Sequence, residues 1–272
     1  MNEVAFSRKA DRLVDIEFRA GGAPRVVVRG DVDFRRAPEI REAIANLLEQ
    51  GRKRVDVHLA DVVFMDSSGI SALLDSVRLA RENNARLVLV SPTRQLMHLL
   101  EVSGFEPLFE FEQLPSAVIP PVPRPVRPSV YWQMSEFSVP CDPELVADIR
   151  HRVAQIADSM PFTTEEIEDV KLAVGEAATN AFRYGCPGGR ADSIRVRCIG
   201  DSGALTVEIT DSGAGFDPGL VPQPALGSLE MGGRGLFFMK LAMDEVDFRW
   251  LDKGTCVRMV KHVKAPPPPA GQ

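Results

Sequence analysis

The chain of 272 residues has a formal net charge of −6, with 44% hydrophobic and 26% charged residues. This composition is ordinary for a globular protein, and the length suits two domains with separate cores. The acidic balance argues against general nucleic-acid binding, and no apolar stretch is long enough to span a bilayer.

The beginning of the chain, from Met1 to Asp15, lacks the apolar core of a signal peptide, which predicts a cytoplasmic protein. The four cysteines show no Cys-x-x-Cys spacing, so neither a zinc site nor a redox pair is indicated. We therefore expect reduced thiols at Cys141, Cys186, Cys198 and Cys256.

Strands and helices alternate in the first part of the chain. Apolar residues recur every three to four positions from Ala37 to Gln50, which predicts an amphipathic helix that Gly51 ends. The predicted order is strand 25–30, helix 37–50, strands 54–59 and 62–65, helix 71–83, strand 86–90 and helix 95–101. This alternation predicts an α/β domain, with helices between the strands of one sheet.

The tetrapeptide Asp66-Ser67-Ser68-Gly69 lies where a predicted strand gives way to a helix. Unpaired backbone N–H groups and the positive end of the helix dipole stabilise a phosphate at such a place. A phosphate would add a charge of about −1.5 to −2, enough to displace a docked partner. The alternative is a plain helix cap, since Asp66, Ser67 and Ser68 are all good capping residues.

The surroundings of this tetrapeptide favour a phosphorylation site. The order strand, Gly-Asp-Val-Asp, amphipathic helix, strand, Phe-Met-Asp-Ser-Ser-Gly-Ile and helix resembles the STAS domain of bacterial anti-sigma factor antagonists, over roughly residues 15–113. In that family the serine directly after the aspartate is phosphorylated. The resemblance implies that Ser67 is the phosphoacceptor, with Ser68 as its neighbour and second choice.

A proline-rich stretch divides the chain. Six of the fourteen residues from Pro115 to Pro128 are proline, which excludes a helix or a central strand. Such a segment is a semi-rigid spacer of about 3 Å per residue. The sequence therefore predicts a first domain at 1–114, a linker at 115–129, a second domain at 130–264 and a disordered tail at 265–272.

The second domain is predicted to combine helices with a sheet. Thr163 to Glu166 has the form of a capping box, which predicts the start of a long helix that reaches about Tyr184. The predicted order is helices 144–158 and 163–184, strands 193–199 and 205–211, a glycine- and proline-rich loop at 213–235, helix 236–243, and strands 245–251 and 255–262. We expect an α+β fold with its helices on one side of a mixed or antiparallel sheet.

Three stretches of this domain suggest a nucleotide site. Glu176 and Asn180 project from one helix face, where an amide oxygen suits Mg²⁺ and a carboxylate can accept a hydroxyl proton. Asp211 follows a strand and can accept a hydrogen bond from an adenine amino group. Gly232-Gly233-Arg234-Gly235 precedes a helix whose N-terminal amides can hold phosphates. Each stretch alone is also explained as a polar helix face or an ordinary turn. The prediction of a nucleotide site therefore rests on the order in which the three stretches occur.

In this order the three stretches resemble the Bergerat-type ATP-binding fold of histidine kinases, gyrase, chaperone ATPases and anti-sigma factor serine kinases, from about residue 136 to 262. The resemblance is closest to the anti-sigma factor serine kinases, on Leu-Ala-Val-Gly-Glu-Ala-Ala-Thr-Asn-Ala and Leu-Phe-Phe-Met-Lys-Leu-Ala-Met-Asp-Glu-Val. It implies ATP and Mg²⁺ as cofactors, Glu176 as general base and Asn180 as the Mg²⁺ ligand. The other nucleotide-binding residues that it implies are Asp211, Gly213, Gly215, Gly233, Arg234, Gly235 and Thr255. Many members have histidine where Tyr184 stands, a change that bears on phosphoryl transfer more than on ATP binding.

Together the two resemblances predict a partner-switching regulator of bacterial transcription. The second domain would phosphorylate Ser67, or its equivalent in a separate STAS protein, and so control the sequestration of a sigma factor. The implied partners are the sigma factor, separate STAS or anti-sigma proteins, a PP2C-type metal-dependent serine phosphatase that resets the serine, and a second copy of the chain as a homodimer.

Two alternatives differ in the chemistry that they require. In the first, the chain is a non-catalytic, nucleotide-gated scaffold whose STAS domain occupies an inactive kinase-like domain. In the second, it is a sensor histidine kinase with His151 as phosphoacceptor. His151 lacks the acidic residue directly after it and the downstream proline that are usual in that motif, so we expect a surface or packing residue.

Overall fold

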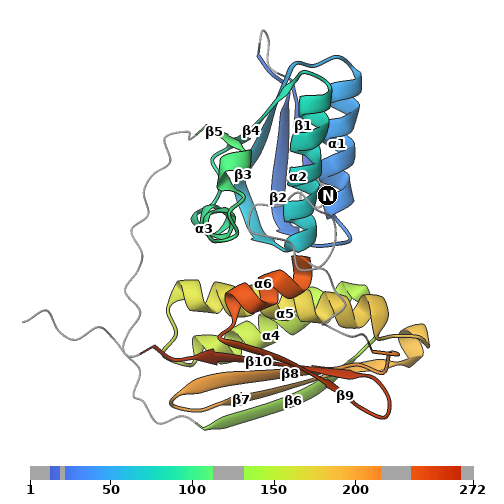
Figure 1. Ribbon diagram of the computed structural model, residues 1–272, viewed down its shortest axis with the longest axis vertical. Coiled ribbons are helices and arrows are strands. Elements are labelled where there is room, and N and C mark those ends of the chain that lie inside the picture. The colour runs from blue at the N-terminus through green and yellow to red at the C-terminus, as the bar shows by residue number, and fades with distance from the viewer. Residues whose placement is uncertain (1–12, 19–21, 113–131, 216–233, 265–272) are drawn as a thin grey trace, which may run out of the picture. The chain divides into compact units, whose positions relative to one another are not determined.

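The structure is a computed structural model that describes residues 13–18, 22–112, 132–215 and 234–264. These residues form two compact units, an N-terminal unit that ends at residue 112 and a C-terminal unit that starts at residue 132 (Figure 1). The predicted linker and tail, and most of the predicted glycine- and proline-rich loop, lie outside the described residues. The proposed domain boundaries therefore stay predictions.

The N-terminal unit is built on a five-stranded sheet in the order β1-β2-β3-β4-β5. Strands β2 to β5 pair in parallel, and β1 pairs antiparallel with β2. The strands are β1 Val14–Glu17, β2 Arg25–Val32, β3 Arg54–Met65, β4 Arg86–Val90 and β5 Glu110–Glu112, and the helices are α1 Ala37–Glu49, α2 Ser67–Glu82 and α3 Arg94–Val102, followed by a short 3₁₀ turn, η1 Glu106–Leu108. The alternation confirms the predicted α/β class.

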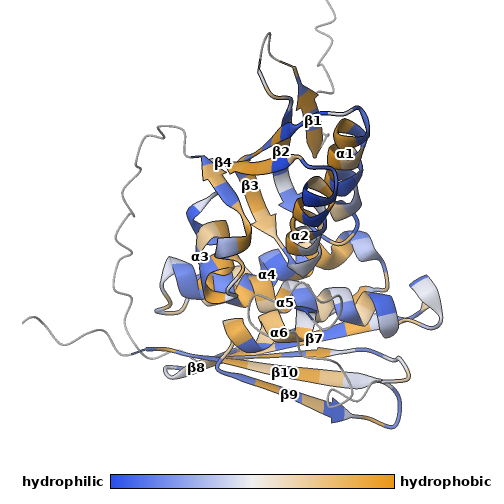
Figure 2. Ribbon diagram, turned by 45° about the horizontal axis from the view of Figure 1, so that its top comes forward, coloured by the Kyte–Doolittle hydropathy of each residue, from blue (hydrophilic) through white to orange (hydrophobic). Residues whose placement is uncertain are grey.

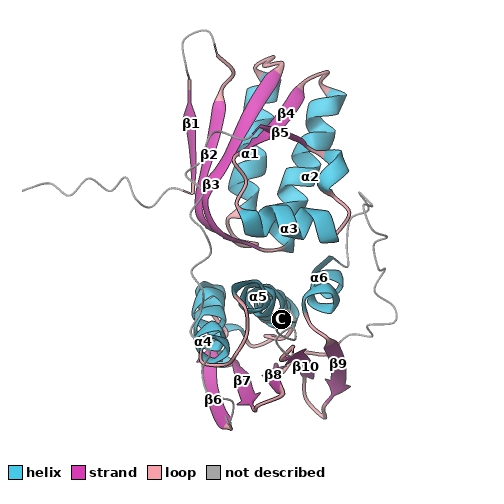
Figure 3. Ribbon diagram, turned by 90° about the vertical axis from the view of Figure 1, so that its left-hand side faces the viewer, coloured by secondary structure: helices cyan, strands magenta, loops and turns pink. Residues whose placement is uncertain are grey.

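Helices α1 and α2 lie side by side and bury their apolar stripes (Figure 3). Ile40 and Ile44 of α1 and Ile70 and Leu73 of α2 are fully buried. Strands β3 and β4 supply the facing hydrophobic residues (Figure 2). The core follows directly from the helical spacing of apolar residues.

Helix α2 starts earlier than the sequence analysis predicted. The predicted start was residue 71, but the first helical residue is Ser67 and Asp66 is the N-cap. Gly69 fits inside the first turn because this turn packs closely on the sheet: a Cβ at residue 69 would lie 2.5 Å from Cγ of Met65 and 2.8 Å from Cγ1 of Val32. Gly69 is therefore required by close packing between the first turn of α2 and the sheet.

The C-terminal unit is an antiparallel sheet in the order β6-β7-β8-β10-β9. Its strands are β6 Gln133–Pro140, β7 Ser193–Gly200, β8 Ala204–Thr210, β9 Glu245–Trp250 and β10 Thr255–His262, and its helices are α4 Val146–Asp158, α5 Thr164–Tyr184 and α6 Arg234–Ala242, with 3₁₀ turns η2 Pro143–Leu145 and η3 Gly189–Ala191. All three helices cover the same face of the sheet (Figures 1 and 3). This confirms the predicted α+β class.

The capping box predicted for the long helix is confirmed. The hydroxyl of Thr163 accepts a hydrogen bond from the amide of Glu166 at 3.1 Å, and the Glu166 carboxylate accepts one from the amide of Thr163 at 2.8 Å. Both exchanges satisfy amides that a helix start would otherwise leave unpaired. They fix the beginning of the helix that carries Glu176 and Asn180.

The sheet face opposite the helices carries a row of alternating charges. Register places Glu136, Arg197, Glu208, Arg258 and Asp247 side by side across all five strands. Within the row, the ion pairs Arg197–Glu208 and Arg258–Asp247 join neighbouring strands at 3.6 and 3.1 Å. Cross-strand pairs of opposite charge favour this register.

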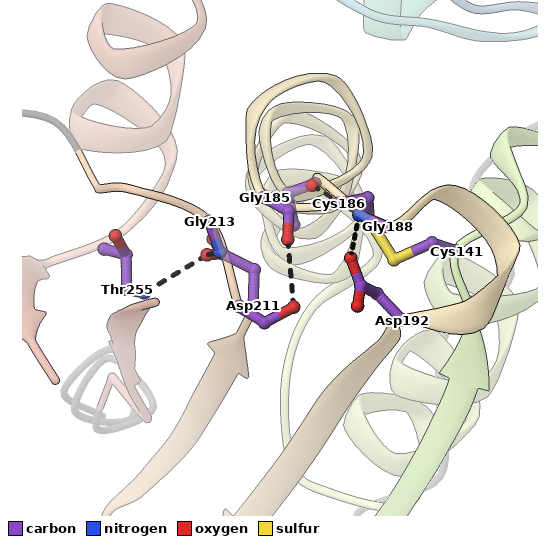
Figure 4. Close-up of a disulfide and its surroundings, with 10 residues drawn as sticks. Cys141, Gly185, Cys186, Gly188, Asp192, Asp211, Gly213 and Thr255 are labelled. Atoms are coloured by element: carbon purple, nitrogen blue, oxygen red, sulfur yellow. Dashed lines mark hydrogen bonds between the residues drawn. A yellow bond between two sulfur atoms is a disulfide. The ribbon is translucent and has the colours of Figure 1, made fainter. Parts of the chain in front are cut away.

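The cysteine prediction was partly wrong. Cys141 and Cys186, 45 residues apart in sequence, form a disulfide in the C-terminal unit (Figure 4). Cys141 directly follows β6 and Cys186 lies two residues beyond the end of α5. The expectation of a thiol rested on short Cys-x-x-Cys spacing, which does not detect a pair brought together by the fold. Cys198 and Cys256 are free thiols, as expected, and both are buried.

Within the described residues, no helix is both long and apolar enough to cross a membrane.

Candidate functional site

The carboxylate of Asp211 is fixed in orientation at the end of β8. Its Oδ1 accepts hydrogen bonds from the amide of Gly213 at 2.9 Å and from the amide of Thr255 at 3.1 Å. Both donors bind the same oxygen, and within the described residues no donor binds the other oxygen, Oδ2, so Oδ2 can accept a hydrogen bond from a ligand.

Apolar side chains from the helix and from three strands surround this carboxylate. Ile209, Val257 and Phe248 are cross-strand neighbours on β8, β10 and β9. They form one wall of a pocket, and α5 forms another. The full set of lining residues is Ala177, Asn180, Ala181, Tyr184, Ile209, Asp211, Gly215, Phe248, Thr255 and Val257. An apolar slot with one oriented acceptor suits a flat heterocycle that carries an amino group.

Glycines allow the backbone to close around this slot. A Cβ at Gly213 would lie 2.5 Å from the carbonyl oxygen of Tyr184, and a Cβ at Gly185 would lie 2.4 Å from Asp211. Gly215 has a φ of +76°, and a Cβ on it would lie 3.1 Å from Cδ1 of Trp250. Side chains larger than glycine at these three positions would therefore collide with the residues that form the slot.

The Glu176 and Asn180 side chains meet the start of α6. A Cβ at Gly235 would lie 2.7 Å from Oε2 of Glu176 and within 4 Å of both side-chain heteroatoms of Asn180. Glu176 is 2% exposed and Arg234, the first residue of α6, is 5% exposed. The carboxylate, the amide and the N-terminus of α6 therefore form one cluster next to the apolar slot.

The slot is narrow, with a cavity volume of about 20 Å³. That is space for about one water molecule. The chemistry of the slot fits an adenine ring, whereas its size requires the walls to move apart when a ring enters. Of the residues that line the slot, Tyr184 is an aromatic side chain that is 70% exposed, so little packing holds it in its present place.

The fold brings most of the predicted nucleotide residues together. Asn180, Asp211, Gly215 and Thr255 line one pocket, Gly213 donates to Asp211, and Glu176, Arg234 and Gly235 form the adjoining cluster. Gly233 lies outside the described residues.

Sequence analysis missed the apolar wall and Gly185. The wall residues Ile209, Phe248 and Val257 look like ordinary strand residues, and only register aligns them. The sequence does indicate one of these residues, because Ile209 lies two positions before Asp211 and therefore on the same strand face. His151 lies on α4 and is exposed, which agrees with the surface reading.

The serine motif of the N-terminal unit is organised around Asp66. Its Oδ1 accepts hydrogen bonds from the amides of Ser68 at 2.8 Å and Gly69 at 3.1 Å, and its Oδ2 accepts one from Phe34 at 3.1 Å. Two N-terminal amides of α2 thus already have an anionic partner. A phosphate on Ser67 would therefore share these amides with the Asp66 carboxylate, and the role of Ser67 as phosphoacceptor stays a prediction.

Burial separates the two candidate serines. Ser67 is 9% exposed and its carbonyl accepts a hydrogen bond from the hydroxyl of Ser71, whereas Ser68 is half-buried. Asp66 is 1% exposed, and its burial raises its pKa to about 6, helped by the nearby charge of Asp33 and opposed by the three amide hydrogen bonds. Burial therefore disfavours the negative charge that Asp66 places at the start of α2.

Comparison with known proteins separates the same two parts of the chain. Residues 139–261 match the histidine kinase-like ATPase domain family, and residues 17–110 match the Mlab, STAS domain family. The serine-protein kinase RsbW of Bacillus licheniformis is 34% identical over 46% of this chain and 83% of its own length. RsbW of Bacillus subtilis is 33% identical over 47% of this chain and 84% of its own length.

The chain belongs to the RsbW family of histidine kinase-like ATPases. Its RsbW-like part carries the Asp211 pocket, and its STAS part carries the Asp66-Ser67 motif. Among solved structures, phosphorylated SpoIIAA of Bacillus is 21% identical over 38% of this chain and 91% of that chain, with a TM-score of 0.33.

Proposed function

We propose that this chain is an ATP-dependent serine kinase that phosphorylates a STAS-domain serine and thereby controls the sequestration of a sigma factor. The observation that carries the proposal is the oriented Asp211 carboxylate in an apolar slot, next to the Glu176–Asn180–Gly235 cluster. The RsbW relationship supports it, since the relatives are named serine-protein kinases. The substrate serine is Ser67 of this chain or its equivalent on a separate STAS protein.

Each residue of the cluster has a chemical role in this proposal. Mg²⁺-ATP, when bound, supplies the phosphoryl group and the charge neutralisation that its transfer requires. Asp211 accepts a hydrogen bond from the adenine amino group through its Oδ2. Asn180 provides the amide oxygen for Mg²⁺, and the N-terminal amides of α6, from Arg234 and Gly235, face the phosphates. Gly233 is proposed to extend this phosphate contact.

Glu176 is proposed as the general base. Its carboxylate would accept the proton of the serine hydroxyl while the serine oxygen forms a bond to the γ-phosphorus and the bond from that phosphorus to the bridging oxygen breaks, which releases ADP. The side chain is 2% exposed, so the base is withheld from bulk water before the substrate arrives. Burial next to a helix N-terminus gives the carboxylate a defined position, which is the main contribution of the protein to such transfers.

The test is incubation of the full chain with γ-labelled ATP and Mg²⁺, followed by phosphopeptide mapping. We expect one phosphate on Ser67, absent from Ser67→Ala and from Glu176→Gln and retained in Ser68→Ala. Glu165→Gln is the matched control, because Glu165 is an exposed carboxylate on the first turn of the same helix. A rate linear in protein concentration indicates transfer within one chain, and a quadratic rate indicates transfer between chains.

Other outcomes separate the alternatives. ATP binding without phosphate on this chain, but with phosphate on an added STAS protein, moves the substrate to a separate partner. ATP binding without transfer to either supports the nucleotide-gated scaffold, which the presence of Tyr184 in place of histidine favours. The further partners that we propose are the sigma factor, an anti-sigma protein, a PP2C-type phosphatase and a second copy of the chain.

A further inference from the structure

The Cys141–Cys186 disulfide lies beside the slot that contains Asp211 (Figure 4). We propose that this cysteine pair is a redox-responsive modification site, whose reduction by a dithiol lowers the affinity of the C-terminal unit for nucleotide. The inference rests on the proposed function, because the property that it alters is nucleotide binding in the Asp211 slot.

One residue separates the crosslink from the Asp211 carboxylate. Gly185, directly before Cys186, accepts a hydrogen bond on its carbonyl from the amide of Ser212 at 3.1 Å. A Cβ on Gly185 would lie 2.4 Å from both Cβ and Cγ of Asp211. The position of the backbone at residue 185 therefore limits where the Asp211 side chain can lie, and the disulfide limits the position of residue 185.

The other half of the crosslink belongs to a firmly held turn. The amide of Cys141 donates to the carbonyl of Asp192 at 3.0 Å, and the Asp192 carboxylate accepts from the amide of Gly188 at 2.6 Å. The segment from Cys186 to Asp192 is thus attached to the end of β6 at both of its ends (Figure 4). Because the Asp192 contacts remain after reduction, breaking the disulfide frees one end of this segment and leaves the other in place.

The exchange reaction needs one dithiol and consumes no other reagent. A thiolate of the dithiol attacks the sulfur of Cys186, which is half-buried, and the sulfur of Cys141, which is 5% exposed, leaves as a thiolate. The second thiol of the dithiol then attacks the mixed disulfide and releases the Cys186 thiolate. The protein gains two electrons and two protons, and the dithiol becomes a disulfide.

The reduced state has a defined structural alternative. The sulfur of Cys186 lies 3.5 Å from the carbonyl oxygen of Ala181, which also accepts the amide of Gly185 at 2.8 Å. A free thiol at Cys186 can donate to that carbonyl, on the last turn of α5. Once the crosslink is gone, residues 185–188 have more conformations to lose when nucleotide binds, and the affinity falls for that reason.

The remaining cysteines do not interfere with this pair. Cys198 and Cys256 are buried in strands β7 and β10. Burial raises the pKa of the Cys198 thiol to about 12, so it carries almost no reactive thiolate at neutral pH. Exchange among the described cysteines is therefore confined to Cys141 and Cys186.

The test compares ADP binding by the full chain before and after treatment with dithiothreitol. Alkylation under denaturing conditions, followed by intact mass, is expected to label two cysteines in the untreated protein and four in the treated protein. We expect the Kd for ADP to rise roughly three- to tenfold on reduction, a size typical of coupling between sites. Cys141→Ser and Cys186→Ser should show the weaker affinity with or without dithiothreitol, and Cys198→Ala is the control that keeps the full response.

The outcomes distinguish this inference from the proposed function. Equal ADP affinity in the two redox states overturns the inference and leaves the proposed ATP site standing. Four labelled cysteines in the untreated protein, even after exposure to a disulfide oxidant, also overturn it. Absence of nucleotide binding in both states overturns the proposed function and this inference with it. The comparison of oxidised and reduced wild-type protein needs no variant, so a variant that fails to fold does not weaken the test.

Discussion

Asp211 and Thr255 are joined by two reciprocal hydrogen bonds across 44 residues of sequence. The amide of Thr255 donates to Oδ1 of Asp211 at 3.1 Å, and the amide of Asp211 donates to the carbonyl of Thr255 at 3.0 Å. The first bond orients the carboxylate and the second places its backbone. The Asp211 carboxylate, the acceptor proposed for adenine, is therefore fixed by hydrogen bonds to the neighbouring strand β10. Its orientation is set before any ligand binds.

Asp211→Asn should weaken ATP binding about 10- to 100-fold. If the amide oxygen keeps the two backbone donors, its NH₂ group opposes the adenine amino group, which leaves two donors facing each other. Calorimetry with ADP measures the effect. Asp201→Asn is the matched control, because Asp201 accepts two turn amides between β7 and β8 in the same way and does not line the slot. Equal losses in both variants would mean that Asp211 acts only as a turn cap.

Gly185→Ala should destabilise the C-terminal unit by about 1–3 kcal/mol and weaken nucleotide binding. The added methyl group would lie 2.4 Å from Asp211, so either the carboxylate or the backbone has to move. Thermal unfolding with and without ADP measures both effects. Gly203→Ala is the control, since its Cβ would meet only Oδ1 of Asp201 at an ordinary 3.5 Å. An unchanged ADP-induced shift in Gly185→Ala would contradict the close packing described here.

Asp66 should titrate with a midpoint near pH 6, above the usual range for aspartate. Burial is the main cause, and the charge of Asp33 adds to it. A carboxyl with a raised folded-state pKa binds more protons when folded, so its contribution to stability is largest below about pH 4 and is lost as the pH rises through 6. The loss is about 3 kcal/mol from this group alone. Carbon-detected NMR of the Asp66 carboxyl gives the midpoint, and Asp66→Asn should remove this component of the pH dependence. A midpoint near 4 would contradict the prediction.

Reduction of the disulfide should lower the unfolding free energy of the C-terminal unit by about 4 kcal/mol, on a chain-entropy estimate for a 45-residue separation. The unfolding transition of the N-terminal unit should stay unchanged, because both cysteines lie in the C-terminal unit. Calorimetric scans with and without reductant separate the two transitions. A shift in both unfolding transitions, or in neither, would contradict the prediction that the disulfide stabilises the C-terminal unit alone.

The sequence predicted those parts of the fold that depend on local pattern. The α5 start followed from Thr163 and Glu166, whose capping exchange is local. The short β1 and β5 and the polar edge strand β6 were not predicted, because an edge strand needs few apolar residues and takes its place from its neighbour. Strands predicted at 54–59 and 62–65 are one strand, β3, because its pairing with β2 resumes at Asp61, opposite Arg29, after a register shift that follows His58.

The features of the candidate site also divide into those that one segment of sequence predicts and those that depend on the tertiary fold. Glu176 and Asn180 share a helix face by spacing alone, and this could be read from the sequence. The reciprocal bonds between Asp211 and Thr255, the apolar wall and the Cys141–Cys186 disulfide depend on which strands become neighbours. Pattern within a single segment does not carry that information. It follows from the sheet order, in which β10 lies between β8 and β9.

That sheet order also has a consequence for synthesis. Every strand of the N-terminal sheet precedes residue 113, so this unit can fold while the C-terminal unit is still being translated. The C-terminal sheet cannot close in the same gradual way, because β10 enters between two strands that are made before it. Since Thr255 lies on β10, a nascent chain that stops after β9 presents the serine motif in a folded unit while Asp211 still lacks its partner. In the course of translation, the serine proposed as the phosphoacceptor is therefore in a folded unit before the site proposed to phosphorylate it is complete.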